Sequence, residues 1–330
     1  MLKIGVLGAG HIGKIHLKCI KNIPEYELVG FYDINDDVAR SVEKEFGIKS
    51  FNTIEDLVSK VDVVDIVTPT IKHFECASVA LRQNKHVFLE KPIVATPLEA
   101  RHLAEIADEA NVKVQVGHVE RFNPAFLAVE DKIKDPMFLE VHRLSQYNSR
   151  GTDVPVIFDL MIHDLDILLH LVKSKVKHIS ASGVPIISST ADIANTRIEF
   201  ENGAVANLTA SRMSMKKMRK CRIFQKNAYI TVDFLEKKSK IISISDEIDE
   251  NNPFAMCLES NDGKIKQLSF EEPEVHDINA IQTELQSFYD AIVNNVEPVV
   301  SMNDGIAALE LAHQINELVM KYLKIFTDLK

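Results

Sequence analysis

Three side chains in this sequence have the types and the spacing expected of acid–base chemistry. Asp159 and His163 are four residues apart in a stretch with helical periodicity, so the carboxylate can orient the imidazole and stabilise its charged form. A histidine held in this way serves as a general base near neutral pH. Lys91 belongs to the stretch Glu90-Lys91-Pro92, which directly follows the predicted strand His86–Leu89. At the end of a strand, its ammonium group could stabilise charge that develops on a ligand oxygen.

Each of these residues also has a structural interpretation. An Asp–His pair one helical turn apart can be a surface ion pair, and Lys91 can be a surface lysine in a turn. Metal binding is a third interpretation of the helix, because Asp166 and His170 follow on the same side. Four residues spread over about three turns cannot all converge on one ion, so we expect no metal site.

The elements that would position these side chains begin with a glycine-rich turn at the N-terminus. An apolar run, Leu2–Leu7, leads into the loop Gly8–Gly13, and a second apolar run ends at Asp33, twenty residues beyond the loop. The first glycine permits a sharp turn, Gly10 lets backbone amides approach a pyrophosphate, and the third glycine lets helix and strand pack closely. Asp33 stands where the partner of a ribose hydroxyl is expected, so the pattern predicts a dinucleotide site.

The residues around Asp33 favour NAD over NADP. A carboxylate at this place hydrogen-bonds a free 2′-hydroxyl and repels a 2′-phosphate, whereas sites that accept the phosphate have an arginine nearby. The next four residues, 34–37, include two aspartates and no base, and the first basic residue is Arg40.

Composition limits the class of protein. A chain of 330 residues is longer than one hydrophobic core usually serves, so two domains are expected. The formal net charge of −10 argues against nucleic acid or an anionic membrane as the partner and favours a small-molecule substrate. The four cysteines are far apart, and neither a signal peptide nor an apolar run of membrane-spanning length is present, so we expect a cytoplasmic protein with reduced thiols.

The pattern of elements changes near residue 122. Before it, apolar runs alternate with helical segments, which predicts a doubly wound parallel sheet, a Rossmann domain, over residues 1–122. Residues 123–330 contain a predicted helix at Val156–Val172, then successive β-rich segments, then two helices. We predict an α+β domain with a large open, mostly antiparallel sheet, whose terminal helix can pack back on the first domain.

Substrate contacts are expected near the domain boundary and in basic stretches. Arg121 and Asn123 follow the last strand of the first domain, and they either bind substrate or brace the junction. Arg150 and the basic run 212–222 favour a diphosphate-bearing substrate, although a solvated strand connection explains the run as well.

Taken together, these residues resemble the glucose-fructose oxidoreductase, inositol dehydrogenase and rhizopine catabolism (Gfo/Idh/MocA) family over essentially the whole chain. The resemblance rests on four motifs in order: Gly8-x-Gly10-x-x-Gly13, Thr68-Pro69 with His73, Glu90-Lys91-Pro92, and Asp159-x-x-x-His163. The strand ends and the resemblance together imply cofactor contacts from Gly8, Gly10, His11, Ile12, Gly13, Asp33, Thr68, Pro69, His73, Glu90 and Lys91.

The resemblance also implies a reaction. In the family, the lysine and the Asp/His pair surround a nicotinamide and a sugar or cyclitol carbinol. Transferred to this sequence, His163 takes the hydroxyl proton as the adjacent carbon releases hydride to NAD, Lys91 holds the oxygen, and Asp159 orients the pair. The family's usual architecture implies a homodimer or homotetramer with the open sheets packed together.

Within the family, residues 117–125 and 159–166 look most like a group that acts on nucleotide-linked amino sugars, the UDP-N-acetylglucosamine 3-dehydrogenases. This likeness implies oxidation of a C3 hydroxyl to a keto sugar. Two alternatives stay open: an NAD(P)-dependent dehydrogenase of a free polyol, inositol or aldose, and a non-catalytic protein that binds NAD and reports redox state to a partner.

Overall fold

The computed structural model describes residues 1–148, 154–247, 256–259 and 263–328, and the chain forms two compact units. The first unit comprises Met1–Phe122 and Asn279–Glu310, and the second comprises Asn123–Ile278 and Leu311–Lys330. Residues 279–310 of the predicted second domain therefore pack in the first unit. The reason is apolar contact, because helix α8 (Ala280–Val293) buries Leu285 and Phe288 in the same core as Leu17 and Ile20.

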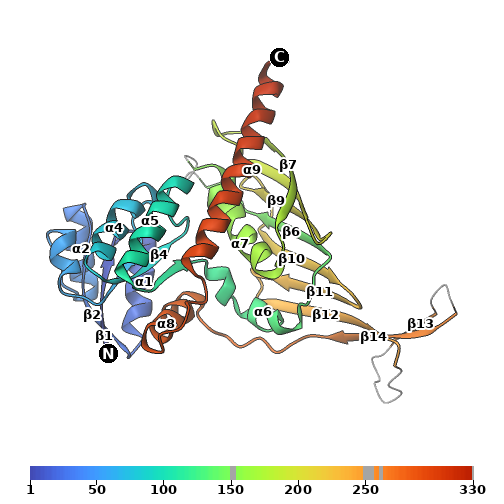
Figure 1. The fold of residues 1–330 in the computed structure, drawn as a ribbon, viewed down its shortest axis with the longest axis horizontal. Helices are drawn as coiled ribbons and strands as arrows, with labels where there is room; N and C mark the ends of the chain where they lie inside the picture. The colour runs from blue at the N-terminus through green and yellow to red at the C-terminus, as the bar shows by residue number, and fades with distance from the viewer. Residues whose placement is uncertain (149–153, 248–255, 260–262, 329–330) are drawn as a thin grey trace. The chain divides into compact units, whose positions relative to one another are not determined.

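The first unit is built on a parallel sheet with helices around it (Figure 1). The strand order is β2-β1-β3-β4-β5. Its strands are β1 (Leu2–Leu7), β2 (Tyr26–Tyr32), β3 (Val63–Ile66), β4 (His86–Glu90) and β5 (Val114–Gly117). Alternate residues of β1 face opposite sides, since Ile4 and Val6 join the core with α8 while Gly5 packs against Leu57. Both faces of the strand are covered, which explains its continuous apolar sequence and confirms the predicted doubly wound domain.

Local signals fix the helix ends in this unit. Its other helices are α1 (His11–Lys21), α2 (Asp36–Phe46), α3 (Ile54–Val58), α4 (His73–Arg82) and α5 (Pro97–Ala110). The Asn35 side chain caps α2 by accepting hydrogen bonds from two backbone amides, and Gly47 ends the helix in the left-handed region at φ 65°. Helix α5 starts with a reciprocal capping box between Thr96 and Glu99.

The second unit contains a sheet of nine strands among the residues that the structure describes, in the order β13-β14-β12-β11-β10-β6-β9-β8-β7. The strands are β6 (Phe138–Leu144), β7 (Val176–Val184), β8 (Ile193–Phe200), β9 (Val205–Ser211), β10 (Met218–Gln225), β11 (Ala228–Asp233), β12 (Lys238–Ser245), β13 (Met256–Glu259) and β14 (Ile265–Glu271). Only the β6–β9 pair is parallel among these neighbours, so the predicted open, mostly antiparallel sheet is confirmed. Neither β13 nor β14 was predicted from the sequence: β13 has only four residues, all exposed, and polar residues interrupt the alternation in β14.

Helical segments of the second unit include α6 (Pro124–Leu127), α7 (Ile162–Leu171) and the later part of α9 (Met302–Asp328). A π-helical turn at Ile157–Met161 precedes α7, where the sequence predicted one regular helix. Arg143 of β6 donates two hydrogen bonds to the Asp164 carboxylate of α7, Nε to Oδ2 at 2.9 Å and Nη2 to Oδ1 at 2.7 Å, and both side chains are buried. This bidentate pair anchors α7 to the sheet. None of the helices in the described ranges is both long and apolar enough to cross a membrane.

Candidate active site and cofactor cavity

A cavity of about 670 Å³ opens at the carboxyl ends of the strands in the first unit. Its walls come from the glycine loop and from the ends of β2 and β3. The predicted cofactor residues that line it are Gly8, Gly10, His11, Ile12, Asp33, Thr68 and Pro69. Segments far apart in the sequence therefore meet at one cavity, as the strand-end argument predicts.

Glycine suits each of the three loop positions for a different structural reason. Gly8 has φ +97°, a conformation that residues with a Cβ rarely adopt. A Cβ on Gly13 would lie 2.2 Å from the Gly8 carbonyl oxygen, so close packing of α1 on the loop requires glycine there. A Cβ on Gly10 would meet nothing within 4 Å, and this residue caps α1 and lines the cavity. Gly10 thus leaves space at a helix N-terminus, which fits the approach of a dinucleotide pyrophosphate.

Asp33 connects the end of β2 to the glycine loop. Its Oδ2 accepts a hydrogen bond from the Ala9 amide at 2.8 Å, and its Oδ1 accepts one from the Asn35 amide at 2.9 Å. The carboxylate therefore shapes the loop and also borders the cavity, where a ribose would be bound. Two strongly exposed isoleucines, Ile34 at 84% and Ile71 at 78%, add apolar walls that sequence reasoning missed, because exposure cannot be read from residue type.

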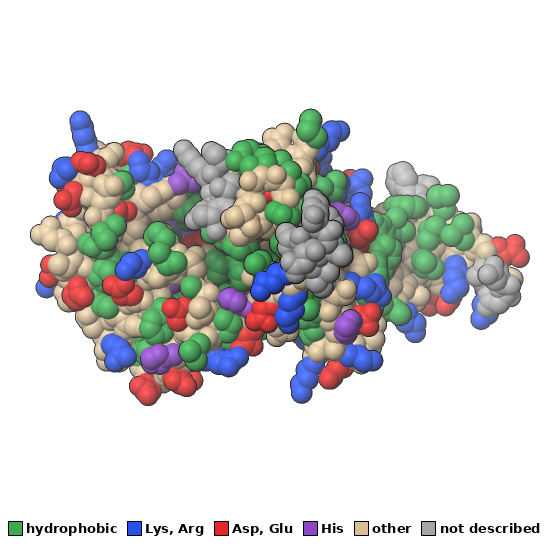
Figure 2. Space-filling view, turned by 90° about the horizontal axis from the view of Figure 1, so that it is seen from above, with side chains coloured by type: hydrophobic (Ala, Val, Ile, Leu, Met, Phe, Trp, Pro, Cys, Tyr) green, Lys and Arg blue, Asp and Glu red, His purple; other side chains and the backbone are tan. Residues whose placement is uncertain are grey.

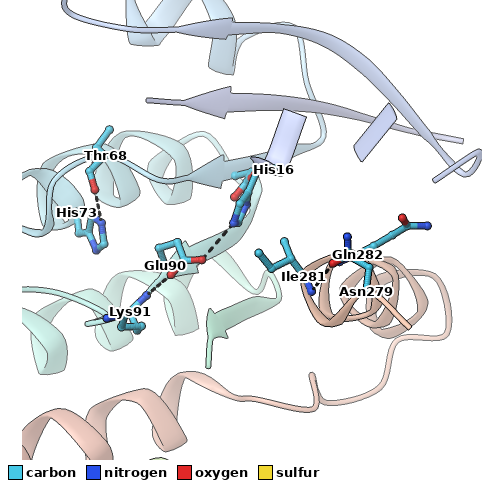
Figure 3. Close-up of polar contacts among 9 residues, drawn as sticks. His16, Thr68, His73, Glu90, Lys91, Asn279, Ile281 and Gln282 are labelled. Carbon is cyan, nitrogen blue, oxygen red and sulfur yellow. Dashed lines mark hydrogen bonds and ion pairs between the residues drawn. The ribbon is translucent and has the colours of Figure 1, made fainter. Parts of the chain in front are cut away.

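Four residues of the predicted cofactor set do not line this cavity: Gly13, His73, Glu90 and Lys91. His73 is buried, with Nδ1 2.9 Å from the Pro92 carbonyl oxygen and Nε2 2.9 Å from the Thr68 carbonyl oxygen. It braces the turns that follow β3 and β4, and Figure 3 shows the contact with Thr68. Burial lowers the pKa of His73 below its usual value, which favours the neutral imidazole.

Lys91 stands in the turn after β4. It is half-buried, its backbone amide donates to Glu90 Oε2 at 3.1 Å, and its peptide bond to Pro92 is cis. The expected position of the lysine, at the carboxyl end of a sheet strand, is therefore the one that the structure shows.

Asp159 and His163 lie in consecutive helical turns of the second unit and are both half-buried. Asp159 belongs to the π-helical turn and His163 to the first turn of α7. The other two members of the helix series are placed differently. Asp166 is buried, and His170 Nε2 lies 2.6 Å from Glu130 Oε1.

The basic and substrate-side residues have internal partners. Arg121 is buried, with Nη2 3.8 Å from Asp304 Oδ1, and Asn123 caps α6 while its Nδ2 donates to the Phe234 carbonyl oxygen at 3.0 Å. In the basic run, Lys220 and Arg222 pair with carboxylates of neighbouring strands. Arg150 lies outside the described residues.

Comparison with known proteins agrees with this geometry. Residues 2–118 match the model of a family described as an oxidoreductase family with an NAD-binding Rossmann fold, and residues 134–231 match the GFO/IDH/MocA C-terminal domain. A UDP-N-acetylglucosamine 3-dehydrogenase of Acidithiobacillus ferrooxidans is 37% identical over 235 residues, which cover 71% of this chain and 74% of the relative. The chain belongs to the Gfo/Idh/MocA family. It is therefore an NAD(P)-dependent oxidoreductase that acts on CH–OH groups of a small-molecule substrate, and NAD is its cofactor.

Further known proteins are similar along nearly the whole chain. The solved structure of the A. ferrooxidans enzyme GnnA superposes with a TM-score of 0.88 at 32% identity, covering 98% of both chains. An inositol 2-dehydrogenase of Rhizobium meliloti is 27% identical and covers 94% of both chains. A scyllo-inositol dehydrogenase from Lactobacillus casei, solved with NAD(H) and scyllo-inositol, shares the fold with a TM-score of 0.77 at 21% identity over 97% of both chains.

Proposed function

We propose that this protein oxidises the C3 hydroxyl of UDP-N-acetylglucosamine, or of a related UDP-sugar, to a keto group with NAD as the oxidant. The observation that carries the proposal is the likeness to the A. ferrooxidans enzyme, at 37% identity in sequence and a TM-score of 0.88 in structure. The inositol 2-dehydrogenase is less similar, at 27% identity, which places a free cyclitol second.

Three side chains carry the proposed chemistry. NAD bound at the glycine loop supplies the acceptor for the hydride that leaves the carbinol carbon. The His163 imidazole takes the proton of the carbinol hydroxyl, and Asp159 orients that imidazole and stabilises its charged form. The Lys91 ammonium group donates a hydrogen bond to the carbinol oxygen and stabilises the charge that develops there. Loss of one hydride and one proton leaves the ketone, so electrons and protons balance without a metal.

The test is direct identification of the product. Purified full-length protein is incubated with NAD and a panel of UDP-sugars, inositols and aldoses, and the sugars are analysed by mass spectrometry for loss of two hydrogens. Product analysis is preferred to NADH absorbance, because bound cofactor can be recycled within one catalytic cycle. A keto product from UDP-N-acetylglucosamine supports the proposal, whereas turnover of free inositol or glucose alone supports the runner-up.

Variants test the assigned roles. Lys91→Ala and His163→Ala are expected to lower kcat by at least about 100-fold while the Kd for NAD stays within about threefold, since neither residue lines the cofactor cavity. His170→Ala is the matched control on α7, because its imidazole contacts Glu130 and should leave kcat near wild type. Full turnover by the Lys91 or His163 variant would contradict its role. NAD binding without oxidation of any sugar in the panel would point to the non-catalytic regulator.

The substrate-side residues remain proposals. Arg121 and Asn123 have structural partners, so loss of activity on their substitution would be ambiguous. Arg150→Ala is the more informative variant. If Arg150 binds the diphosphate, KM for the UDP-sugar should rise about tenfold or more while turnover at saturation persists.

We also propose that the protein is a cytoplasmic homodimer or homotetramer. Apolar side chains are exposed at the end of the second sheet, where Figure 2 shows them gathered, and they include Met256, Leu258, Ile265 and Phe270. Such apolar patches favour association with a second copy. The cysteines are free thiols, as expected in a reducing compartment. Light scattering on the purified protein tests the oligomer, and a monomer at micromolar concentration would contradict it.

A further inference from the structure

A group of four ionisable side chains lies in the first unit, next to the turn that carries Lys91. They come from four different elements: His16 from α1, Asp65 from β3, Glu90 from β4 and Glu284 from α8. His16, Asp65 and Glu284 are 0% exposed. None of the four lines the cofactor cavity, so direct contact with NAD there does not explain them.

His16 is held from both sides by carboxylates. Its Nδ1 lies 2.9 Å from Asp65 Oδ2, and its Nε2 lies 3.1 Å from Glu90 Oε1 (Figure 3). An ionised carboxylate only accepts hydrogen bonds, so both ring nitrogens donate only if the imidazole is charged. Burial alone lowers the pKa of His16, but the charges and hydrogen bonds of Asp65 and Glu90 outweigh burial and raise it well above its usual value.

Glu90 contacts Lys91 as well as His16. One carboxylate oxygen faces His16, and the other accepts the hydrogen bond from the Lys91 backbone amide at 3.1 Å. Gly117 confines the carboxylate from a further side, because a Cβ there would lie 3.1 Å from Glu90 Cδ and 3.2 Å from Oε1. The Glu90 side chain therefore has little freedom to move, and the backbone at Lys91 is tied to it.

Glu284 completes the group without a second ion pair. Neither of its carboxyl oxygens has a hydrogen-bond partner among the described residues, and one of them lies within 4.8 Å of ligand atoms of His16 and Glu90. Burial, with the neighbouring charge of Glu90, raises the pKa of Glu284 well above its usual value, so a neutral acid is favoured. The positive charge of the His16 imidazolium is therefore balanced by Asp65 and Glu90.

We propose that His16 is a positioning residue for the oxidation: through the Glu90 carboxylate it holds the backbone at Lys91, and so the ammonium group that binds the carbinol oxygen in the proposed function. Stability alone does not account for the arrangement, because well-packed apolar side chains replace a buried ion pair with little or no loss of stability. Glu90 contacts both His16 and the Lys91 amide, so it links the buried ion pair to the residue that binds the carbinol oxygen.

Two substitutions of His16 separate this role from a purely structural one. The amide of glutamine reaches about as far along the side chain as Nε2, whereas that of asparagine reaches only as far as Nδ1. His16→Gln can therefore still donate to Glu90, while His16→Asn can donate only to Asp65. Both variants lose the charge, so both are expected to lower thermal stability. Leu17→Ala, at the next buried position of α1, is the control for a loss of stability without loss of a polar contact.

The first measurement does not depend on activity. Hydrogen exchange of the Lys91 amide, followed in the full chain, should be faster by about tenfold or more in His16→Asn and within about threefold of wild type in His16→Gln and Leu17→Ala. The second measurement is kcat on the sugar identified above, with the same order expected: His16→Asn down about tenfold or more, the other two near wild type, and the Kd for NAD unchanged in all three. Equal effects of asparagine and glutamine, or effects that follow melting temperature alone, overturn the proposal.

Gly117→Ala provides a test if the His16 variants fail to fold. It leaves every charge in place but pushes on the Glu90 carboxylate, so faster Lys91 amide exchange and a lower kcat are expected, and wild-type values of both would overturn the proposal. The outcome is distinguishable from failure of the proposed function. Full turnover by Lys91→Ala refutes the assigned role of the lysine, whereas the exchange measurement reports whether His16 holds the turn.

Discussion

The glycine loop allows a prediction in which two alanine substitutions, three residues apart, fail for different reasons. In Gly13→Ala the new Cβ would lie 2.2 Å from the Gly8 carbonyl oxygen and 2.9 Å from the Gly8 carbonyl carbon. Both neighbours are backbone atoms, so α1 must move away from the loop. In Gly10→Ala the new Cβ meets no protein atom within 4 Å, and the backbone at φ −66°, ψ −161° is open to alanine.

The magnitudes follow from these contacts. A contact of 2.2 Å with a backbone atom belongs in the upper part of the range for overpacking, about 2–3 kcal/mol. The better helix propensity of alanine returns about 0.5–1 kcal/mol, so Gly13→Ala should lose about 1–2.5 kcal/mol. For Gly10→Ala, a poorer helix cap and a less flexible unfolded chain oppose each other at about 0.5–1 kcal/mol each, so stability should hardly change. Its methyl group projects at the helix N-terminus, where loss of one hydrogen bond to a charged phosphate costs about 1.5–3 kcal/mol, or about 10- to 150-fold in affinity for NAD.

Thermal melts and NAD titrations of the two variants beside wild type form the assay. Gly10→Ala should melt within about 2 °C of wild type and bind NAD at least about tenfold more weakly, while Gly13→Ala should melt about 3–8 °C lower. Wild-type NAD affinity in Gly10→Ala would refute the placement of the pyrophosphate at this helix end. An unchanged melting temperature in Gly13→Ala would refute the packing argument.

Three further predictions concern other side chains. Asp33→Asn should weaken the binding of NAD about tenfold and reduce the protein's preference for NAD over NADP, as measured by titration with both cofactors. Asparagine is a better choice than alanine because the Asp33 side chain also accepts a hydrogen bond from the Ala9 amide. An unchanged preference for NAD would contradict the ribose role of Asp33. Burial and the charges of Glu90 and Asp65 raise the folded-state pKa of Glu284 and outweigh the opposing charge of His16, so the stabilisation from its acid form is present at low pH and is lost as the pH rises from the ordinary carboxyl pKa towards the folded-state value. Glu284→Gln should therefore melt higher than wild type at pH 8 and similarly at pH 4, and a difference of the reverse sense would show that the carboxyl is charged and stabilised. Asp164→Asn should lower the free energy of unfolding in urea by about 3–5 kcal/mol, because it removes the carboxylate charge that pairs with the buried Arg143 guanidinium. Arg222→Gln, which breaks a partly exposed pair with Glu140, should cost no more than about 1 kcal/mol.

The sequence by itself determined the parts of the protein that follow from local pattern. Continuous apolar runs separated by amphipathic segments specify a parallel sheet covered on both sides, and the loop Gly8–Gly13 with Asp33 specifies a dinucleotide site because sharp turns and close approaches have strict residue requirements. The glycine loop, Thr68-Pro69 with His73, and the motifs around Lys91 and His163 together indicated the family, which the comparisons then showed. Such features can be predicted from the sequence because each rests on short runs of residues or on a spacing along the chain.

Only the tertiary structure decided what depends on contacts between distant segments. Residues 279–310 follow the β-rich half in sequence but pack in the first unit, because Leu285 and Phe288 complete its core. No role for His16 was predicted from the sequence, because its partners Asp65 and Glu90 lie 49 and 74 residues away in the chain and reach its two ring nitrogens only in the folded protein. The behaviour of a buried charge depends on the groups around it, and the packing of strands and helices determines which groups those are, whatever their spacing along the chain.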